Sequence, residues 1–312
     1  MAKSCPGTHA LLELTARSCQ LAEVSVGTRD LWADWLLARR FPDEDRRPVL
    51  AYLGRIRDKV LDNAGLLGGE TLLDVGCGDG LIGFGAMDRG AGKVVFSDVS
   101  QDLLDTCESA ASELGLADRC RFALASADDL AVIESRSVDV VTTRSVLIYV
   151  KDKEQAFAEF YRVLRPGGRV SLFEPINSFS RPVSPGWLWA YELPGLEPLV
   201  ERVGSVFERN QPPDSDPMLD FDERDLVRLA EQAGFGEIQL QLTIEVKSPG
   251  PRSWESFLRT VPNPKVPSLG DAIEEALEPH EREELIGRLR PLVEQGRGRV
   301  RSAVAYLSAT SG

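Results

Sequence analysis

The sequence predicts an α/β fold in which a parallel sheet is covered by helices. From Gly69 onward, short β-branched runs alternate with helical stretches, which is the pattern of chains that form such sheets. A glycine-rich segment at residues 72–80 joins the first of these runs to a helix. The hydrophobic fraction of 43% is ordinary for a globular protein.

Each element follows from the spacing of its apolar residues and from the residues at its ends. Ser100 stands where a helix needs an N-cap, and the segment 164–168, LRPGG, ends another helix because proline cannot continue it and glycine can turn it. The predicted strands are Thr71–Val75, Lys93–Asp98, Cys120–Ala125, Val138–Ser145, Arg169–Glu174, Glu237–Val246 and Ser302–Ser308. The predicted helices among them are Leu81–Arg89, Ser100–Leu114, Lys153–Leu164 and Glu223–Ala233, and a further helix, Val49–Leu61, precedes the first strand.

Three regions lie outside this alternation: a helical leader at about residues 8–68, a proline-rich segment, and the stretch between the last two strands. We therefore predict a helical N-terminal cap at residues 1–68 and one domain at residues 69–312. Two lid insertions are expected in that domain, at about residues 176–220 and 247–297.

Composition restricts the function. The five cysteines are an odd number without CxxC spacing, which argues against a disulfide framework and a zinc site. The formal charge of -13 disfavours a nucleic-acid partner, since no basic face with interleaved aromatics offsets it. No run of about 18 apolar residues and no secretory signal are visible, so we expect a cytoplasmic protein without a membrane partner.

The segment Leu72–Gly80, LLDVGCGDG, is an apolar strand that enters a glycine-rich turn and then a helix. Glycine is needed where bare backbone approaches a ligand, because a Cβ would block that approach. Asp98 follows 24 residues after Asp74, at the end of the second predicted strand, where a carboxylate can accept both hydroxyls of a ribose. The two features together predict an adenosine-containing cofactor.

A dinucleotide-binding fold is the rival interpretation, since residues 78–83 formally match GxGxxG. The acid Asp74 before the first glycine disfavours it, because a pyrophosphate prefers a helix N-terminus free of carboxylates. The chain also lacks a candidate acid for hydride transfer. S-adenosylmethionine (SAM), which carries cationic ammonium and sulfonium groups, fits the acidic turn better.

The stretch Thr71–Pro175 resembles the core of class I SAM-dependent methyltransferases, especially the quinone-methyltransferase-like small-molecule group. The resemblance rests on LLDVGCGDG, VVFSDVS, ASADDL, VDVVTTRSVLIYV and EFYRVLRPGGRVSLFEP. It implies a Rossmann-like, doubly wound sheet of seven strands with the last antiparallel. It also implies that SAM, and its product S-adenosylhomocysteine, lies across the carboxyl ends of the first, second and fourth strands.

The resemblance further implies a role for individual residues. Asp74, Gly76, Cys77 and Gly78 would surround the methionine half of SAM, and Asp98 would hold its ribose. The remaining cofactor contacts would be Val99 against adenine, Ser126 and Ala127 at the adenine edge, and Arg144 and Ser145 at the methionine end. Ser126 stands where relatives often have aspartate, so the adenine-amino contact could pass to Ala127 or Asp128.

Methyl transfer from a sulfonium is an in-line displacement, so positioning and exclusion of water carry most of the catalysis. Tyr149, where many relatives have histidine, and Glu174 are the candidates for taking a proton from the acceptor. For Glu174, a carboxylate bound to loop backbone is an equally good interpretation. His9 and His280, the two histidines of the chain, are expected to be solvated.

Aromatic residues in the leader and in the proline-rich insertion could wall a closed pocket for an apolar or aromatic small molecule, although packing alone also explains them. The predicted substrate-binding residues are Trp32, Trp35, Tyr149, Trp187 and Tyr191. Tyr52 and Arg55 could close the site, while the acidic run Glu274–Glu284 is expected to be an exposed helix and no metal is assigned.

The predicted function is methyl transfer to oxygen or carbon of a small apolar, aromatic or isoprenoid-like metabolite by a monomer or homodimer. Three alternatives stay open: a nitrogen or thiol acceptor, including arsenite; a catalytically silent module that binds SAM or S-adenosylhomocysteine; and a nicotinamide-dependent oxidoreductase. Arsenite methylation is disfavoured because it needs several convergent thiolates.

Overall fold

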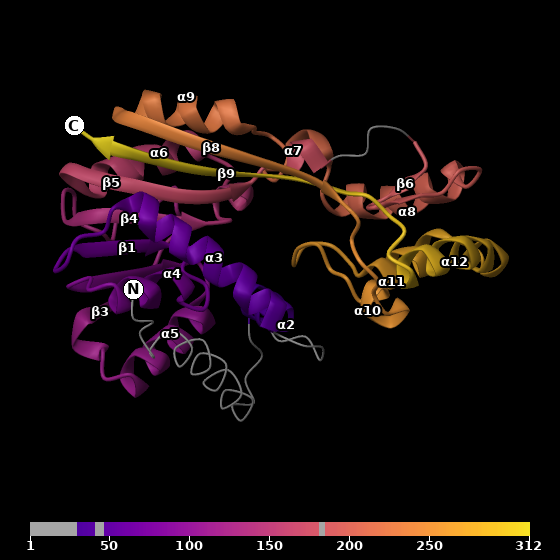
Figure 1. Ribbon diagram of the computed structural model, residues 1–312, viewed down its shortest axis with the longest axis horizontal. Helices are drawn as coiled ribbons and strands as arrows, with labels where there is room; N and C mark the ends of the chain where they lie inside the picture. The colour runs from indigo at the N-terminus through magenta and orange to yellow at the C-terminus, as the bar shows by residue number, and fades with distance from the viewer. Residues whose placement is uncertain (1–29, 41–46, 181–184) are drawn as a thin grey trace, which may run out of the picture. The chain divides into compact units, whose positions relative to one another are not determined.

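A computed structural model describes residues 30–40, 47–180 and 185–312 of the chain. Its centre is a seven-stranded sheet in the order β3-β2-β1-β4-β5-β9-β8, whose strands run side by side in Figure 1. Strands β1 to β5 pair in parallel. The strands are β1 Thr71–Val75, β2 Lys93–Asp98, β3 Cys120–Leu124, β4 Val138–Arg144, β5 Leu164–Pro175, β8 Phe235–Lys247 and β9 Val300–Ser311.

Strand β9 runs against β5. The amide of Ile176, just after β5, donates to the carbonyl oxygen of Ala303 early in β9, at 2.8 Å. At the opposite end, the Ser311 hydroxyl donates to the carbonyl oxygen of Arg165 at 2.7 Å. The end of β5 therefore lies beside the start of β9, which makes the last strand antiparallel and confirms the predicted fold class.

Every predicted strand is present, and the largest difference is at β5. This strand begins at Leu164, five residues before the predicted start, because Leu164 already pairs with Val138 of β4. The next pair is Val140 with Arg169, so the intervening residues of β5 bulge out of the ladder. Gly167, with φ of 75°, supplies the left-handed backbone that this bulge requires.

The predicted helices also form, with ends that differ by at most three residues. Ser100 caps α5 as expected, since its hydroxyl accepts the amide of Leu103 at 3.1 Å. Asp152 caps α6 in the same way by accepting the amide of Gln155. These helices are α4 Leu81–Asp88, α5 Gln101–Glu113, α6 Lys153–Val163 and α9 Glu223–Ala233, with the 3₁₀ turns η2 Ala117–Arg119 and η3 Leu147–Tyr149 between them.

Helices cover both faces of the sheet. Helix α3, Arg47–Ala64, lies on one face, where the Ser171 hydroxyl of β5 donates to the carbonyl oxygen of Val60 at 2.8 Å. Helix α4 lies on the same side and approaches β2 closely: a Cβ on Gly83 would stand 2.2 Å from the Phe96 ring. The β4-α6-β5 crossover runs in the other direction along the sheet, so its right-handedness places α6 on the opposite face, where it packs on α9.

The chain divides into two compact units. The first holds the described residues up to Glu174, together with Glu223–Gln241 and Ala305–Gly312. The second unit holds residues 175–222 and 242–304, which include both predicted insertions. The leader contributes α2, Leu31–Arg40, and α3 to the first unit, while residues 1–29 lie outside the described part of the chain.

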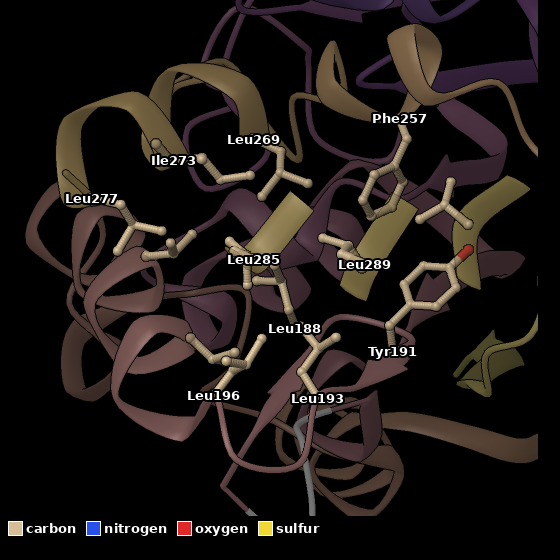
Figure 2. Close-up of a cluster of buried hydrophobic side chains, with 14 of the residues drawn as sticks. Leu188, Tyr191, Leu193, Leu196, Phe257, Leu269, Ile273, Leu277, Leu285 and Leu289 are labelled. Carbon is tan, nitrogen blue, oxygen red and sulfur yellow. The ribbon is translucent and has the colours of Figure 1, made fainter. Parts of the chain in front are cut away.

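The second unit has a hydrophobic core of its own. Leucines of α11 and α12 meet Tyr191, Leu188 and Phe257 there, and their side chains point toward one another in Figure 2. Leu285 and Leu289 of α12 are completely buried in this cluster. The elements of the unit are α7 Asn177–Ser180, β6 Trp187–Leu188, β7 Tyr191–Glu192, α8 Glu197–Asn210, η4 Pro213–Ser215, α10 Trp254–Leu258, α11 Leu269–Ala276 and α12 Pro279–Glu294.

The two insertions thus form one folded unit, although the sequence predicted them as two separate lid insertions. Strands β6 and β7 form a short antiparallel hairpin that the sequence analysis missed. Within the described ranges, no helix has both the length and the apolar character needed to cross a membrane.

The core of the second unit predicts a large effect for Leu289→Ala. Removing a completely buried leucine leaves a cavity, so we expect the free energy of unfolding to fall by about 2–5 kcal/mol. Urea denaturation followed by circular dichroism measures this change. Ile244→Ala is the matched control, because Ile244 is half-exposed and its truncation should change stability by less than about 0.5 kcal/mol. Equal losses in the two variants would contradict the assigned core.

Candidate functional site

The glycine turn after β1 is held by backbone hydrogen bonds. The amide of Cys77 donates to the carbonyl oxygen of Ser97 in β2, and the amide of Gly80 donates to that of Cys77, both at 2.9 Å. Gly76, Gly78 and Gly80 have φ values of 62°, 55° and 81°, which side chains rarely adopt. A Cβ on Gly76 would also lie 2.3 Å from a methyl carbon of Val146. The turn therefore requires glycine both for its conformation and for its packing.

Two thiols lie beneath this turn. The Sγ atoms of Cys77 and of Cys107 in α5 lie 3.8 Å and 3.3 Å from the carbonyl oxygen of Gly78. Both cysteines are buried, and burial is the largest cause that raises the pKa of the Cys77 thiol well above its ordinary value. They are protonated donors that hold the turn and are not reactive nucleophiles.

Asp98 ends β2 next to the turn and is almost fully buried. One of its carboxylate oxygens accepts the amide of Gly78 at 2.9 Å, and the other accepts the amide of Ser100 at 3.0 Å. Burial raises the pKa of this carboxyl, while the amides of Gly78, Ser100 and Val99 lower it. The carboxylate thereby joins the glycine turn to the start of α5.

These residues fit an adenosine group. A carboxylate has about four acceptor positions, so Asp98 keeps acceptor capacity for a ribose hydroxyl beside its bonds to backbone amides. Val99 follows directly and is 54% exposed, an unusual position for valine that offers an apolar surface to a flat base. The predicted adenine-edge residues Ser126 and Ala127 come just after β3, which pairs with β2. The Ser126 hydroxyl donates to the carboxylate of Asp128, and Ala127 is buried.

Asp74 has a structural role in this geometry. One carboxylate oxygen accepts the amide of Gly83 in α4 at 2.9 Å, and the other accepts the Thr142 hydroxyl of β4 at 3.1 Å. Burial raises the pKa of Asp74 to about 7, against the effect of these bonds and of the Arg144 charge. Asp74 thus joins three elements around the turn, and its predicted contact with the methionine half stays a prediction.

Glu174 holds the loop that follows β4. Its carboxylate accepts the amides of Val146, Leu147 and Ile148 at 2.9, 3.0 and 3.4 Å. Burial raises the pKa of Glu174 to about 7, although the three amides lower it. This geometry favours the interpretation of Glu174 as a carboxylate bound to loop backbone, so we assign it a positioning role.

The loop carries the other residues predicted at the methionine end. Ser145 has a φ of 56°, a strained value for a residue with a side chain, and its amide donates to the carbonyl oxygen of Phe173 at 2.8 Å. The Arg144 guanidinium lies close enough to Asp74 and Glu174 to lower the pKa of both carboxyls. Arg144 therefore supplies a positive charge near the buried carboxyls of Asp74 and Glu174.

Three predicted substrate residues gather in the first unit. Tyr149 of η3 meets Trp32 and Trp35 of α2, with ring centroids 4.8 Å and 6.3 Å away, and the rings pack edge to face. All three side chains are half-buried. Leu36 of the same helix reaches the glycine turn, since a Cβ on Gly78 would lie 3.3 Å from its Cδ1 atom. The leader helix α2 therefore contacts both the turn and the loop held by Glu174.

Asp30 is a residue that the sequence analysis missed. Its carboxylate accepts the Ser100 hydroxyl at 2.6 Å and the amides of Trp32 and Ala33, both at 2.9 Å, while its own amide donates to Asp102 at 2.5 Å. It thereby caps α2 and attaches it to α5, beside Asp98, whose pKa it raises. An aspartate just before a helix is the only signal in the sequence that could have indicated this role.

Trp187 and Tyr191 belong to the second unit. The Arg299 guanidinium lies over the Trp187 ring, 5.7 Å from its centroid. Tyr191 is buried in the core of that unit and packs edge to face on Phe257. Packing accounts for Tyr191, and the substrate-binding assignment of both residues stays a prediction.

The remaining candidates lie on the surface or outside the described residues. Tyr52 is half-exposed, His280 is exposed in α12, and His9 falls among residues that the structure does not describe. The described ranges hold no group of three histidine, cysteine or acidic side chains that could bind a metal ion.

Replacement of Glu174 by Gln tests whether the buried Glu174 carboxyl has a raised pKa. Because the folded pKa of about 7 exceeds the ordinary 4.5, the folded protein keeps a proton that the unfolded chain releases between these pH values. The free energy of unfolding should then fall as the pH rises through this window, by on the order of 3 kcal/mol from this group. Glu174→Gln should remove this component, as measured by urea denaturation from pH 4.5 to 8. The exposed Glu108→Gln variant is the control, and an unchanged pH profile in Glu174→Gln would contradict the assignment.

The glycine turn predicts that Gly76→Ala is destabilising. The added Cβ meets Val146 at 2.3 Å and the backbone has a left-handed φ, so we expect a loss of about 1–3 kcal/mol in the free energy of unfolding. Gly54→Ala in helix α3 is the control, since no atom lies within 4 Å of its added Cβ. It should stabilise the protein by about 0.5–1 kcal/mol. Thermal and urea unfolding measure both, and a neutral Gly76→Ala would show that the turn adapts.

Comparison with known proteins agrees with this site. Residues 73–172 match the family model described as a methyltransferase domain. The matched segment runs from β1 through β5, so it includes the glycine turn, Asp98 and the loop after β4. The whole second unit lies outside it.

Among characterised relatives, the ubiquinone/menaquinone biosynthesis C-methyltransferase UbiE of Hahella chejuensis is 34% identical over 136 residues, which is 43% of this chain and 53% of the relative. UbiE of Escherichia fergusonii is 30% identical over 149 residues, or 47% of this chain and 57% of the relative. The chain thus spans about half the length of the curated relatives it matches.

A solved structure shares the fold. The crystal structure of a Bacillus halodurans protein assigned as a methyltransferase has a TM-score of 0.51 and 18% identity, and the match covers 81% of this chain and 97% of that one. The resemblance that the motifs predicted is therefore confirmed for the segment that carries the site. The chain contains a methyltransferase domain of the class I, SAM-dependent type.

Proposed function

We propose that this protein is a SAM-dependent methyltransferase that acts on oxygen or carbon of a small apolar or aromatic molecule. The observation that carries this proposal is the buried Asp98 carboxylate, which is bonded to the glycine turn and retains acceptor positions for a ribose. It lies within the segment that matches the methyltransferase domain model. SAM would supply an electrophilic methyl group on its sulfonium.

The role of the protein's own residues is to hold and orient. Asp98, Val99 and the backbone of the glycine turn would bind the nucleoside, and the loop after β4 would face the reacting end. Glu174 fixes that loop through three amides, so a change at this residue would displace Ser145 and Tyr149 together. Positioning of this kind is the main catalytic contribution that an in-line methyl transfer requires.

Tyr149 is the residue that we propose faces the acceptor. Its ring lies against Trp32 and its phenol is half-buried, so it combines an apolar wall with a group that can take or donate a proton. Glu174 is less suited to that task, because its carboxylate is fully buried and already accepts three amides. We therefore keep Tyr149 as the candidate catalytic residue and treat Glu174 as a positioning residue.

The aromatic cluster of Trp32, Trp35 and Tyr149 supports an apolar or aromatic acceptor. Indole and phenol rings offer flat, weakly polar surfaces that favour such molecules over sugars or charged peptides. The names of the UbiE relatives point to a carbon acceptor in quinone biosynthesis, which is one member of this class. The leader and the second unit, which are outside the matched segment, would set the difference between acceptors.

Two alternatives are separable by experiment. A nitrogen or thiol acceptor would show transfer from labelled SAM to amines or thiols and not to phenols or quinols. A silent binding module would bind SAM without transfer to any acceptor in a panel of these classes. Phenol and quinol methylation detected by mass spectrometry supports the proposal, and its absence across the panel would reject the enzyme assignment.

Asp98→Ala tests the cofactor site directly. Loss of the carboxylate removes its hydrogen bonding to the ribose and loosens the glycine turn, so we expect the dissociation constant for SAM to rise at least about tenfold. Isothermal titration calorimetry measures it. Asp105→Asn is the matched control, since Asp105 is an exposed acid of α5 bonded to Gln101, and it should leave the affinity unchanged. Equal affinity in Asp98→Ala and the parent protein would refute the ribose assignment.

A further inference from the structure

Two arginines of the second unit lie over aromatic rings. The Arg299 guanidinium carbon lies 5.7 Å from the centroid of Trp187, and that of Arg301 lies 5.0 Å from the centroid of Phe179. A guanidinium placed over a ring keeps its N–H donors in its own plane, directed past the ring. Both rings are half-buried, so each pair has one wall in the protein and one side toward solvent.

Neither cation is paired with an acidic side chain among the described residues. Within the described residues, no carboxylate forms an ion pair with Arg299 or Arg301, and this includes Glu192, the cross-strand neighbour of Trp187. The Nε atom of Arg301 is buried and has no hydrogen-bond partner in the part of the chain that the structure describes. A buried donor without a partner is rare, so this atom is a candidate to receive an acceptor from a ligand.

The spacing of the two arginines suits one anion. Residues i and i+2 of an extended chain lie on the same side, with Cα atoms roughly 7 Å apart. Arg299 immediately precedes β9, and its amide donates to the carbonyl oxygen of Ala190 at 2.7 Å, which fixes the backbone at this point. Two neighbouring cations repel each other, and an anion between them removes that repulsion.

The charge and the donor geometry indicate which anion. One guanidinium fork can satisfy a single carboxylate, whereas two forks present enough donors for a phosphate-type group with two or more charges. The chain has 49 acidic and 36 basic residues, so its overall field repels anions and does not attract them nonspecifically. Binding here would depend on local contacts.

We propose that Arg299 and Arg301 form an anion-binding site in the second unit that takes a phosphate or diphosphate group. Trp187 and Phe179 form its aromatic walls. The inference goes beyond the proposed function, because none of these four residues lies in the segment 73–172 that matches the methyltransferase domain. In this proposal the Trp187 ring positions the Arg299 guanidinium, which lies over it.

The test is a calorimetric titration of the full-length protein with inorganic pyrophosphate in the absence of SAM. We expect saturable binding that weakens at least tenfold in Arg301→Gln and also weakens in Arg299→Gln. Arg301→Lys should give an intermediate affinity, because it keeps the charge and loses the planar fork. Arg297→Gln is the matched control, an exposed arginine of the same segment with the same change of charge, and should stay within twofold of the parent.

The proposal would be overturned by a lack of saturable pyrophosphate binding, by an equal loss of affinity in Arg297→Gln, or by binding of succinate as tight as that of pyrophosphate. Arg299 is exposed, so its variant should fold even if Arg301→Gln does not, and unchanged affinity in Arg299→Gln would also reject the site. Because SAM is absent, failure here leaves the proposed methyltransferase function unaffected.

Discussion

The site depends on buried carboxylates at or near the ends of parallel strands, each of which accepts a backbone amide of a neighbouring loop or of the first turn of a helix. Asp98 at the end of β2 accepts the amide of Gly78, and Glu174 near the end of β5 accepts three successive amides of the loop after β4. Asp74 in β1 accepts the amide of Gly83. Loop amides at this edge of the sheet have no strand partner, so a side-chain acceptor satisfies them where burial would otherwise be costly.

Burial disfavours the ionised form of two of these carboxyls, those of Asp74 and Glu174. For Asp74 and Glu174, burial outweighs all the amide bonds and the charge of Arg144, so the pKa of each carboxyl rises to about 7. A protonated acid is a weaker acceptor than a carboxylate but avoids the burial of a charge. The segments around the candidate cofactor site are therefore held most strongly when both acids are ionised, while the fold as a whole is more stable when they are not.

The sequence predicted the sheet and the glycine turn well because both follow from local signals. Short β-branched runs, the Ser100 cap and the glycines of residues 76–80 each predict local structure from neighbouring residues, and the structure contains each predicted feature. The contact of Asp30 with α5 and the role of Glu174 depend on hydrogen bonds between residues 26 to 72 positions apart, for which the sequence has no periodic signal. The bulge at Gly167 and the hairpin β6–β7 were missed for the same reason, since pairing partners decide them.

The division into two units separates the part that sequence resemblance explains from the part that it does not. The first unit contains the segment 73–172 and every predicted cofactor residue, whereas the second has its own core of leucines and aromatic rings. A unit with its own core can change its surface residues without disturbing the carboxylates that hold the glycine turn and the loop after β4. Differences in what such a protein recognises can therefore arise at positions such as Trp187, Arg299 and Arg301. The hydrogen bonds by which Asp98 holds the glycine turn and Glu174 holds the loop after β4 do not depend on those positions.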